Sequence, residues 1–145
     1  MIIRGTVFYN DQYIFENGTS KPKLLVLLNT PAKNDNYLLV RTTSQPHDKP
    51  SRRGCFRNQS VFSIPPGISL FEKHTWILLY TLSEVLPETV RDFRIIGLLD
   101  HRLTEEILDC LFESQGDDIT IHQQKLLRPS LDASKLKNHF DKRRP

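Results

Sequence analysis

The sequence is poor in several residue types and patterns, and each shortage excludes a class of protein. Its two cysteines, in 145 residues, are too few for a disulfide framework, and no cysteine and histidine spacing resembles a zinc site. No apolar run approaches the ~18 residues that span a bilayer, and residues 1–11 lack a charged leader with an apolar core. We therefore expect a cytoplasmic protein without membrane contact, in which Cys55 and Cys110 are free thiols.

Motifs for cofactor chemistry are also missing. The sequence contains no P-loop, no glycine-rich dinucleotide fingerprint and no nucleophile elbow, and its five histidines are scattered without metal-like spacing. With 6 glycines and 9 prolines, the body is not low-complexity either. The sequence predicts one ordinary globular domain that holds no metal and no cofactor.

Short extended segments dominate the first two-thirds of the chain. Runs of β-branched and aromatic residues alternate with turn formers, such as those expected at residues 10–11 and 29–36. The continuous apolar run 24–28 is typical of a central strand that is buried on both faces. The predicted strands are residues 5–9, with an extended course resuming at 13–15, and residues 24–28, 37–43, 61–64 and 75–82. Residues 95–99 are either a short strand or a packed connector, and residues 44–59 are a long mobile loop.

One clear helix follows the strands. Thr104 is the expected N-cap, apolar residues recur on one face through Ser114, and Gly116 is placed to end the helix. We expect the domain to cover residues 1–116. Residues 117–145 form a C-terminal extension, with a possible edge strand at 118–121 and then a basic, flexible tail.

Positive charge is concentrated in two segments. The whole chain has a net charge of only +3, yet residues 41–57 and residues 135–145 each carry five basic residues against one acidic residue. Segments of this kind are typical of contacts with phosphates.

A candidate site follows from the order of the strands. Lys21 begins one predicted strand and the Thr42–Thr43 pair ends the next, so antiparallel pairing brings them to one rim of the sheet. Cations beside hydroxyl groups can hold a phosphate and stabilise charge that develops on it. Ordinary solvated strand ends are the alternative interpretation.

The same order of elements resembles a known family. Gly5 in the first strand is followed by Lys-Pro-x-Leu-Leu-Val-Leu, Leu-Leu-Val-Arg-Thr-Thr-Ser-Gln, Thr-Trp-Ile-Leu-Leu, Ile-Ile-Gly-x-Leu and Leu-Thr-Glu-Glu-Ile-Leu. Over residues 3–113 this resembles the PemK/MazF toxin endoribonucleases. The resemblance implies a mainly β fold, an SH3-like, strongly curved antiparallel β-barrel of five or six strands with a C-terminal helix. It also implies a homodimeric toxin with a cognate antitoxin, which cleaves single-stranded RNA without metal by 2′-OH attack.

The resemblance assigns catalytic residues. Lys21, before Pro22, stands where the family has arginine, and Thr42 or Thr43 supplies the hydroxyl group. Lysine keeps the charge but loses the planar fork that grips a phosphate. The strand at 75–82 lacks the family's carboxylate, so the expected base is Glu16 or His47, the alternative being a slow reaction that relies on electrostatic stabilisation alone.

RNA contacts are expected around this site and along the basic residues of the segment 49–57. Phe56 is the preferred base-stacking residue, whereas Phe62 and Tyr37 are expected in the core. Trp76 is a candidate dimer anchor, with burial in the core of one chain as the alternative. The alternative function is a non-catalytic SH3-like module that binds protein or nucleic acid. The predicted RNA-binding residues are Lys23, Arg41, Ser44, Gln45, Lys49, Arg52, Arg53, Phe56 and Arg57.

Overall fold

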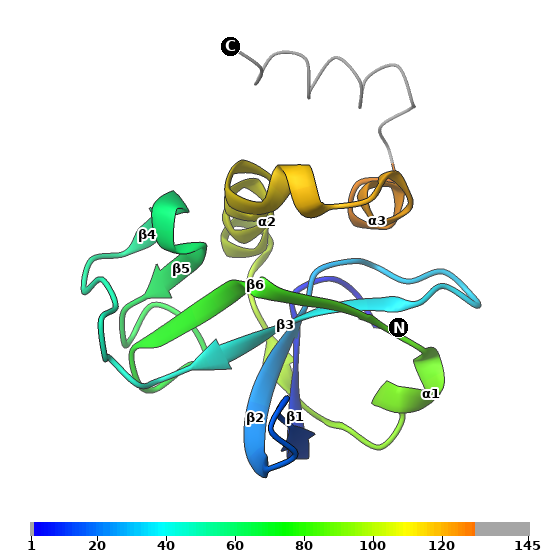
Figure 1. Ribbon diagram of the computed structural model, residues 1–145, viewed down its shortest axis with the longest axis horizontal. Coiled ribbons are helices and arrows are strands. Elements are labelled where there is room, and N and C mark those ends of the chain that lie inside the picture. The colour runs from blue at the N-terminus through cyan, green and yellow to red at the C-terminus, as the bar shows by residue number, and fades with distance from the viewer. Residues whose placement is uncertain (1, 130–145) are drawn as a thin grey trace.

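One antiparallel sheet organises the molecule. The computed structural model describes residues 2–129, and in it seven strands follow the order β4-β5-β6-β3-β2-β1-β7 (Figure 1). The strands are β1 (Thr6–Ile14), β2 (Ser20–Leu27), β3 (Tyr37–Thr43), β4 (Gly54–Phe56), β5 (Val61–Ile64), β6 (Thr75–Val85) and β7 (Arg94–Leu98).

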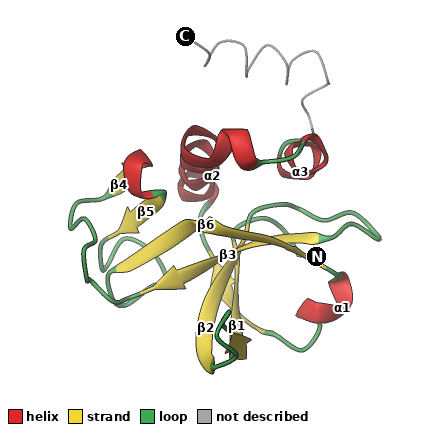
Figure 2. Cartoon of the chain, in the orientation of Figure 1, coloured by secondary structure: helices red, strands yellow, loops and turns green. Residues whose placement is uncertain are grey.

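The helices divide between the two sides of the sheet. Helices α2 (His101–Gln115) and α3 (Ile121–Leu127) lie on one side, whereas the short helix α1 (Pro87–Val90) lies away from them (Figure 2). Two 3₁₀ turns, η1 (Arg57–Gln59) and η2 (Gly116–Asp118), complete the described elements. The predicted mainly β fold with a helix in the C-terminal region is confirmed.

The run 24–28 is buried on both faces of the sheet, as its continuous apolar pattern predicts. Val26 and Leu28 belong to the main core beneath α2, whereas Leu25 and Leu27 pack on the opposite face with Phe8. Alternation of side chains along a strand explains this division. β2 is therefore shared by two separate apolar clusters.

The sheet does not close into a barrel. β4 and β7 are its two ends and do not pair with each other. The expected count of five or six strands was too low because β4 falls inside the segment predicted to be a mobile loop, residues 44–59. The turn expected at residues 10–11 is instead a bulge within β1, where the register with β2 shifts between Asn10 and Tyr13.

Helix α2 begins before the predicted N-cap. Asp100 is the N-cap, and its Oδ1 accepts a hydrogen bond from Leu103 N at 2.7 Å. Thr104 is buried inside the first turn and its hydroxyl donates to Asp100 O. Thr104 is misleading as an N-cap candidate because Asp100, four positions earlier, already accepts a hydrogen bond from an N–H group of the first turn. The apolar face is as predicted: Ile107, Leu108, Leu111 and Phe112 are all buried.

No strand forms at residues 118–121. Thr120 instead begins α3 with a capping box that it shares with Gln123. Ile119 and Leu127 join the main core, so the chain packs on the domain well beyond residue 116. The basic segment 135–145 lies outside the described residues.

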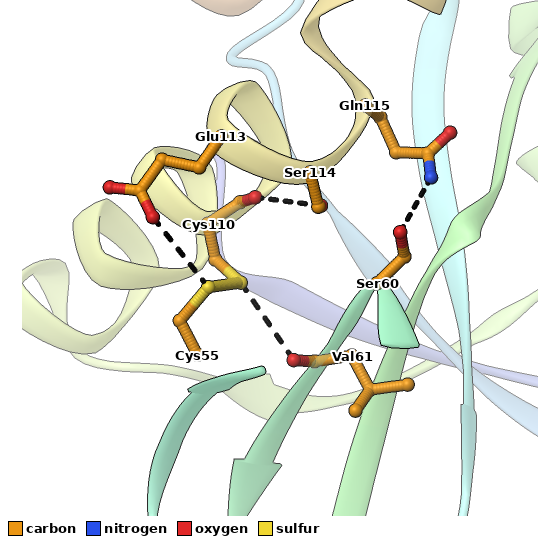
Figure 3. Close-up of a disulfide and its surroundings, with 7 residues drawn as sticks. All are labelled: Cys55, Ser60, Val61, Cys110, Glu113, Ser114 and Gln115. Atoms are coloured by element: carbon orange, nitrogen blue, oxygen red, sulfur yellow. Dashed lines mark hydrogen bonds between the residues drawn. A yellow bond between two sulfur atoms is a disulfide. The ribbon is translucent and has the colours of Figure 1, made fainter. Parts of the chain in front are cut away.

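The expectation of free thiols is wrong. Cys55 on β4 and Cys110 on α2 form a disulfide with a Cα–Cα distance of 5.5 Å (Figure 3). Their separation of 55 residues hides this pairing in the sequence. It arises because β4 pairs with β5 and thereby comes to lie beside α2.

Candidate functional site

Strand alternation places the predicted site residues on two different faces. Leu25 of β2 pairs with Arg41 of β3. Side chains two positions along each strand share that face, so Lys23 and Thr43 lie on the side of Arg41. We call this side, which faces away from α2, the cationic face.

Thr42 lies on the other side. It is 4% exposed, and its hydroxyl donates to Leu24 O at 3.0 Å. Thr43 is half-buried, and its Oγ1 accepts a hydrogen bond from Gln45 N. Of the two threonines left open by the sequence, only Thr43 can meet a ligand on the cationic face.

Four cations gather on this face. Partial burial lowers the pKa of Lys23 below its usual value, and the positive charges of Arg41, Lys21 and Lys49 lower it further. Like charges that act on one another raise the free energy of the folded protein unless an anion neutralises them. The cluster is therefore suited to a ligand with several negative charges.

Aromatic rings hold the arginine of this cluster. The Arg41 guanidinium lies 5.6 Å from the ring centroid of Tyr13 and 5.2 Å from that of Phe15. Lys23 Nζ lies 5.9 Å from the Phe15 ring. Cation–π contacts of this kind restrict the arginine while leaving its N–H groups available to a ligand.

A bulge in β6 shapes the surface beside Arg41. The register between β3 and β6 shifts between Leu39 and Arg41, where residues 79–82 of β6 lie across from a single β3 residue. Thr81 stabilises the bulge, because its Oγ1 accepts from Arg41 N at 2.8 Å and donates to Leu78 O at 2.6 Å. The bulge leaves the Tyr80 side chain 54% exposed. Bulges are common next to functional sites, where they redirect side chains.

Two adjoining cavities meet at Arg41. One has a volume of about 430 Å³ and extends toward Phe93, and the other has a volume of about 640 Å³ and extends toward Tyr80. Glu16 lines the larger cavity, so a carboxylate and a guanidinium share one space. The larger cavity is lined by Tyr13, Ile14, Phe15, Glu16, Asn17, Arg41, Tyr80, Thr81 and Leu82.

Several predicted residues lie elsewhere. Lys21 is exposed and lines neither cavity, although its charge acts on Lys23. His47 pairs with Asp48 at 3.1 Å with its side chain 89% exposed. Arg53 pairs with Glu106 of α2 at 2.7 Å, away from Arg41. The remaining predicted residues that are exposed and line neither cavity are Ser44, Gln45, Arg52 and Arg57.

The segment 44–53, which we call the basic loop, is fastened beside the cationic face. Pro50 O accepts hydrogen bonds from Trp76 Nε1 at 2.7 Å and from Ser63 Oγ at 3.3 Å. His74 stacks on Trp76 with ring centroids 4.1 Å apart. These contacts make Trp76, which is 3% exposed, part of the fold rather than an exposed dimer anchor.

The aromatic residues of the site differ from those predicted. Phe62 is buried, as predicted, whereas Phe56, the expected stacking residue, packs against the cluster of Val61, Trp76 and Leu78. Tyr13 and Phe15 border the larger cavity instead. Their i, i+2 spacing was a usable signal, since it puts both rings on one face of a strand.

Among residues 2–129, no group of three or more His, Cys, Asp or Glu side chains is arranged to hold a metal ion. No helix in this part of the chain is long and apolar enough to cross a membrane. A scan against models of known protein families and a search of curated proteins find no match for this chain.

Proposed function

We propose that the protein is an endoribonuclease that cleaves single-stranded RNA without a metal ion, by attack of the 2′-OH on the neighbouring phosphate. The observation that carries the proposal is the position of Arg41. It lies between two cavities, is held by Tyr13 and Phe15, and shares its face with Thr43 and Lys23.

Binding would combine charge and stacking. Arg41, Lys21 and Lys49 lie close enough to Lys23 for their charges to act on it, and the four cations supply contacts to successive phosphates. The rings of Phe15 and Tyr80 border the larger cavity, where an unpaired base can stack on them. This combination favours a single strand over a duplex, whose bases are already stacked.

The chemical step assigns one role to each of three groups. Glu16 accepts the proton of the 2′-OH as its oxygen bonds to phosphorus. Arg41, with the Thr43 hydroxyl, stabilises the charge on the phosphorane oxygens. Lys23, which gives up a proton more readily because its pKa is lowered, protonates the leaving 5′-oxygen. The products are a 2′,3′-cyclic phosphate and a 5′-hydroxyl.

Arg41 replaces Lys21 as the main phosphate ligand in this proposal. A guanidinium can hold two phosphate oxygens at once, whereas an ammonium acts as a point charge. Arg41 also lines both cavities, whereas Lys21, like Lys23 and Thr43, lines neither. Arg41, on the adjacent strand β3, would therefore supply the guanidinium that is missing where Lys21 stands in place of the family's arginine.

The resemblance to the PemK/MazF toxins also supports a proposal for the biological role of this activity. We place the protein as the toxin of a toxin–antitoxin pair, acting in the cytoplasm as an SH3-like homodimer. Because Trp76 is core, a dimer would need another surface. Sedimentation at roughly tens of micromolar tests this part, and a monomer alone would contradict it.

Cleavage of a long single-stranded RNA in EDTA tests the activity. Arg41→Ala should lower the rate by about 10²–10³, the usual loss for one charge-stabilising group, and Lys21→Ala should lower it less. Arg102→Ala is the matched control, because Arg102 lies on α2 across the sheet and its side chain is 93% exposed. If wild type and Arg41→Ala cleave equally, the assigned site is wrong.

Binding without cleavage would favour the second candidate, a non-catalytic module. Glu16 is exposed, and no hydrogen bond or ion pair among residues 2–129 holds its carboxylate in place, which would then explain the missing chemistry.

A further inference from the structure

The disulfide joins the strand that ends the basic loop to the main helix. Cys55 is the middle residue of β4 and faces α2, because it pairs with Phe62, which belongs to the core on that side. Phe56, the next residue, faces the opposite way and packs against Trp76 and Leu78. β4 is thus fastened on one face by a covalent bond and on the other by one aromatic side chain.

Without the disulfide, β4 has few other attachments. It is a 3-residue strand at the end of the sheet, and within residues 2–129 it pairs with β5 alone. Arg53, just before it, contributes an exposed ion pair with Glu106, which is worth little in water. The disulfide is therefore the strongest single link between the far end of the basic loop and the rest of the molecule.

That link acts against a repulsion. Lys49 precedes Pro50, whose carbonyl is held by Trp76 beside the cationic face, and its positive charge acts on Lys23 together with those of Arg41 and Lys21. Pro50, the residue after Lys49, keeps its hydrogen bonds to Trp76 and Ser63 in either redox state, so a loop that is free at its far end relieves the repulsion by a limited shift of Lys49. A loop fastened at both points keeps the cation in place for a phosphate. Reduction of the disulfide should therefore weaken phosphate binding rather than strengthen it.

We propose that the Cys55–Cys110 disulfide sets how firmly the basic loop is held at the cationic face, so that its reduction weakens the binding of single-stranded RNA. This inference rests on the proposed function for its ligand. Both sulfur atoms already have an oxygen nearby that a thiol can use: Glu113 Oε2 lies 4.0 Å from Cys55 Sγ, and Val61 O lies 3.8 Å from Cys110 Sγ (Figure 3). The reduced state therefore leaves neither thiol without an acceptor.

The reduction is a two-electron exchange with a dithiol. A thiolate of the reductant attacks Cys55 Sγ, because Cys55 is exposed and Cys110 is 1% exposed. The S–S bond breaks, and Cys110 leaves as a thiolate that takes up a proton. The second thiol of the reductant then displaces Cys55 as a thiol and closes the reductant's own disulfide.

Two measurements on the full chain test the inference, each with and without dithiothreitol. Hydrogen exchange without RNA should accelerate on reduction over residues 44–56 but not over β2 and β3. The affinity for a single-stranded 2′-O-methyl RNA, which cannot be cleaved, should fall about fourfold at 0.15 M salt, the loss expected for one phosphate contact. Cys55→Ser should resemble the reduced protein and should not respond to dithiothreitol.

The outcomes separate the two proposals. If hydrogen exchange over residues 44–56 does not change on reduction, the disulfide does not hold the basic loop, whatever the RNA result. Faster exchange with unchanged affinity overturns the regulation and leaves the RNA site standing. Faster exchange in a protein that binds no RNA in either state overturns the proposed function, and the regulation with it.

Discussion

Thr42 and Thr43 are neighbours in sequence with different environments, and their substitution by valine should separate stability from activity. Thr42→Val removes the hydrogen bond to the Leu24 carbonyl and should cost about 1–3 kcal/mol of unfolding free energy, because that acceptor loses its partner. Thr43→Val removes a hydroxyl from the cationic face and should lower the cleavage rate by about 10²–10³. Urea unfolding and RNA cleavage measure the two effects. The opposite pattern would move the catalytic hydroxyl to Thr42.

Lys23 should give the reaction its alkaline limit. A general acid must be protonated, so kcat/KM should fall as pH rises through the lowered pKa of Lys23, starting below the ordinary lysine value of 10.5. Lys23→Arg keeps the positive charge but has no proton to give in this range, so it should be slow and should lack this decline. RNA incubated without enzyme corrects for alkaline hydrolysis. A Lys23→Arg variant with the wild-type profile would exclude Lys23 as the acid.

At the scale of elements, Gly5 fixes where β1 meets helix α2. Its φ is +95°, and a Cβ there would lie 2.7 Å from Thr104 Oγ1 and 3.0 Å from Leu99 O. Gly5→Ala should therefore destabilise the fold by about 2–5 kcal/mol, from backbone strain plus displacement of the first turn of α2. Gly18→Ala is the control, because Gly18 has a φ of +85° but no atom within 4 Å. Equal melting temperatures for the two variants would show that the contact with Thr104 is unimportant.

Elements defined by local pattern were predictable, and those defined by pairing were not. Residues 37–43 and 61–64 are strands with the predicted bounds, because turn formers and β-branched runs specify them locally. The bulge in β6 depends on the register with β3, and the disulfide depends on β4 lying beside α2. Neither relation is encoded in a short window of sequence.

For the whole molecule, the two sides of the sheet differ in the side chains that they carry. The side under α2 holds the main apolar core, whereas the other side carries Arg41 and its surrounding cations. The sequence indicated the neighbourhood of this site, because charge and strand order are visible in it. It did not indicate that Arg41 is central or that Tyr13 and Phe15 hold it, since those roles depend on which face each strand position occupies.

Salt dependence tests whether the cationic face acts as one binding surface. If Lys21, Lys23, Arg41 and Lys49 each neutralise one phosphate of a single strand, log K should fall with log salt with a slope of about −3, or ~50-fold between 50 and 200 mM. Fluorescence anisotropy with the oxidised protein and 2′-O-methyl RNA measures this slope. Lys49→Gln should make it shallower by about 0.7, whereas Arg102→Gln, across the sheet, should leave it unchanged. A slope near zero would mean that phosphates do not carry the binding, and it would favour a protein ligand for this face.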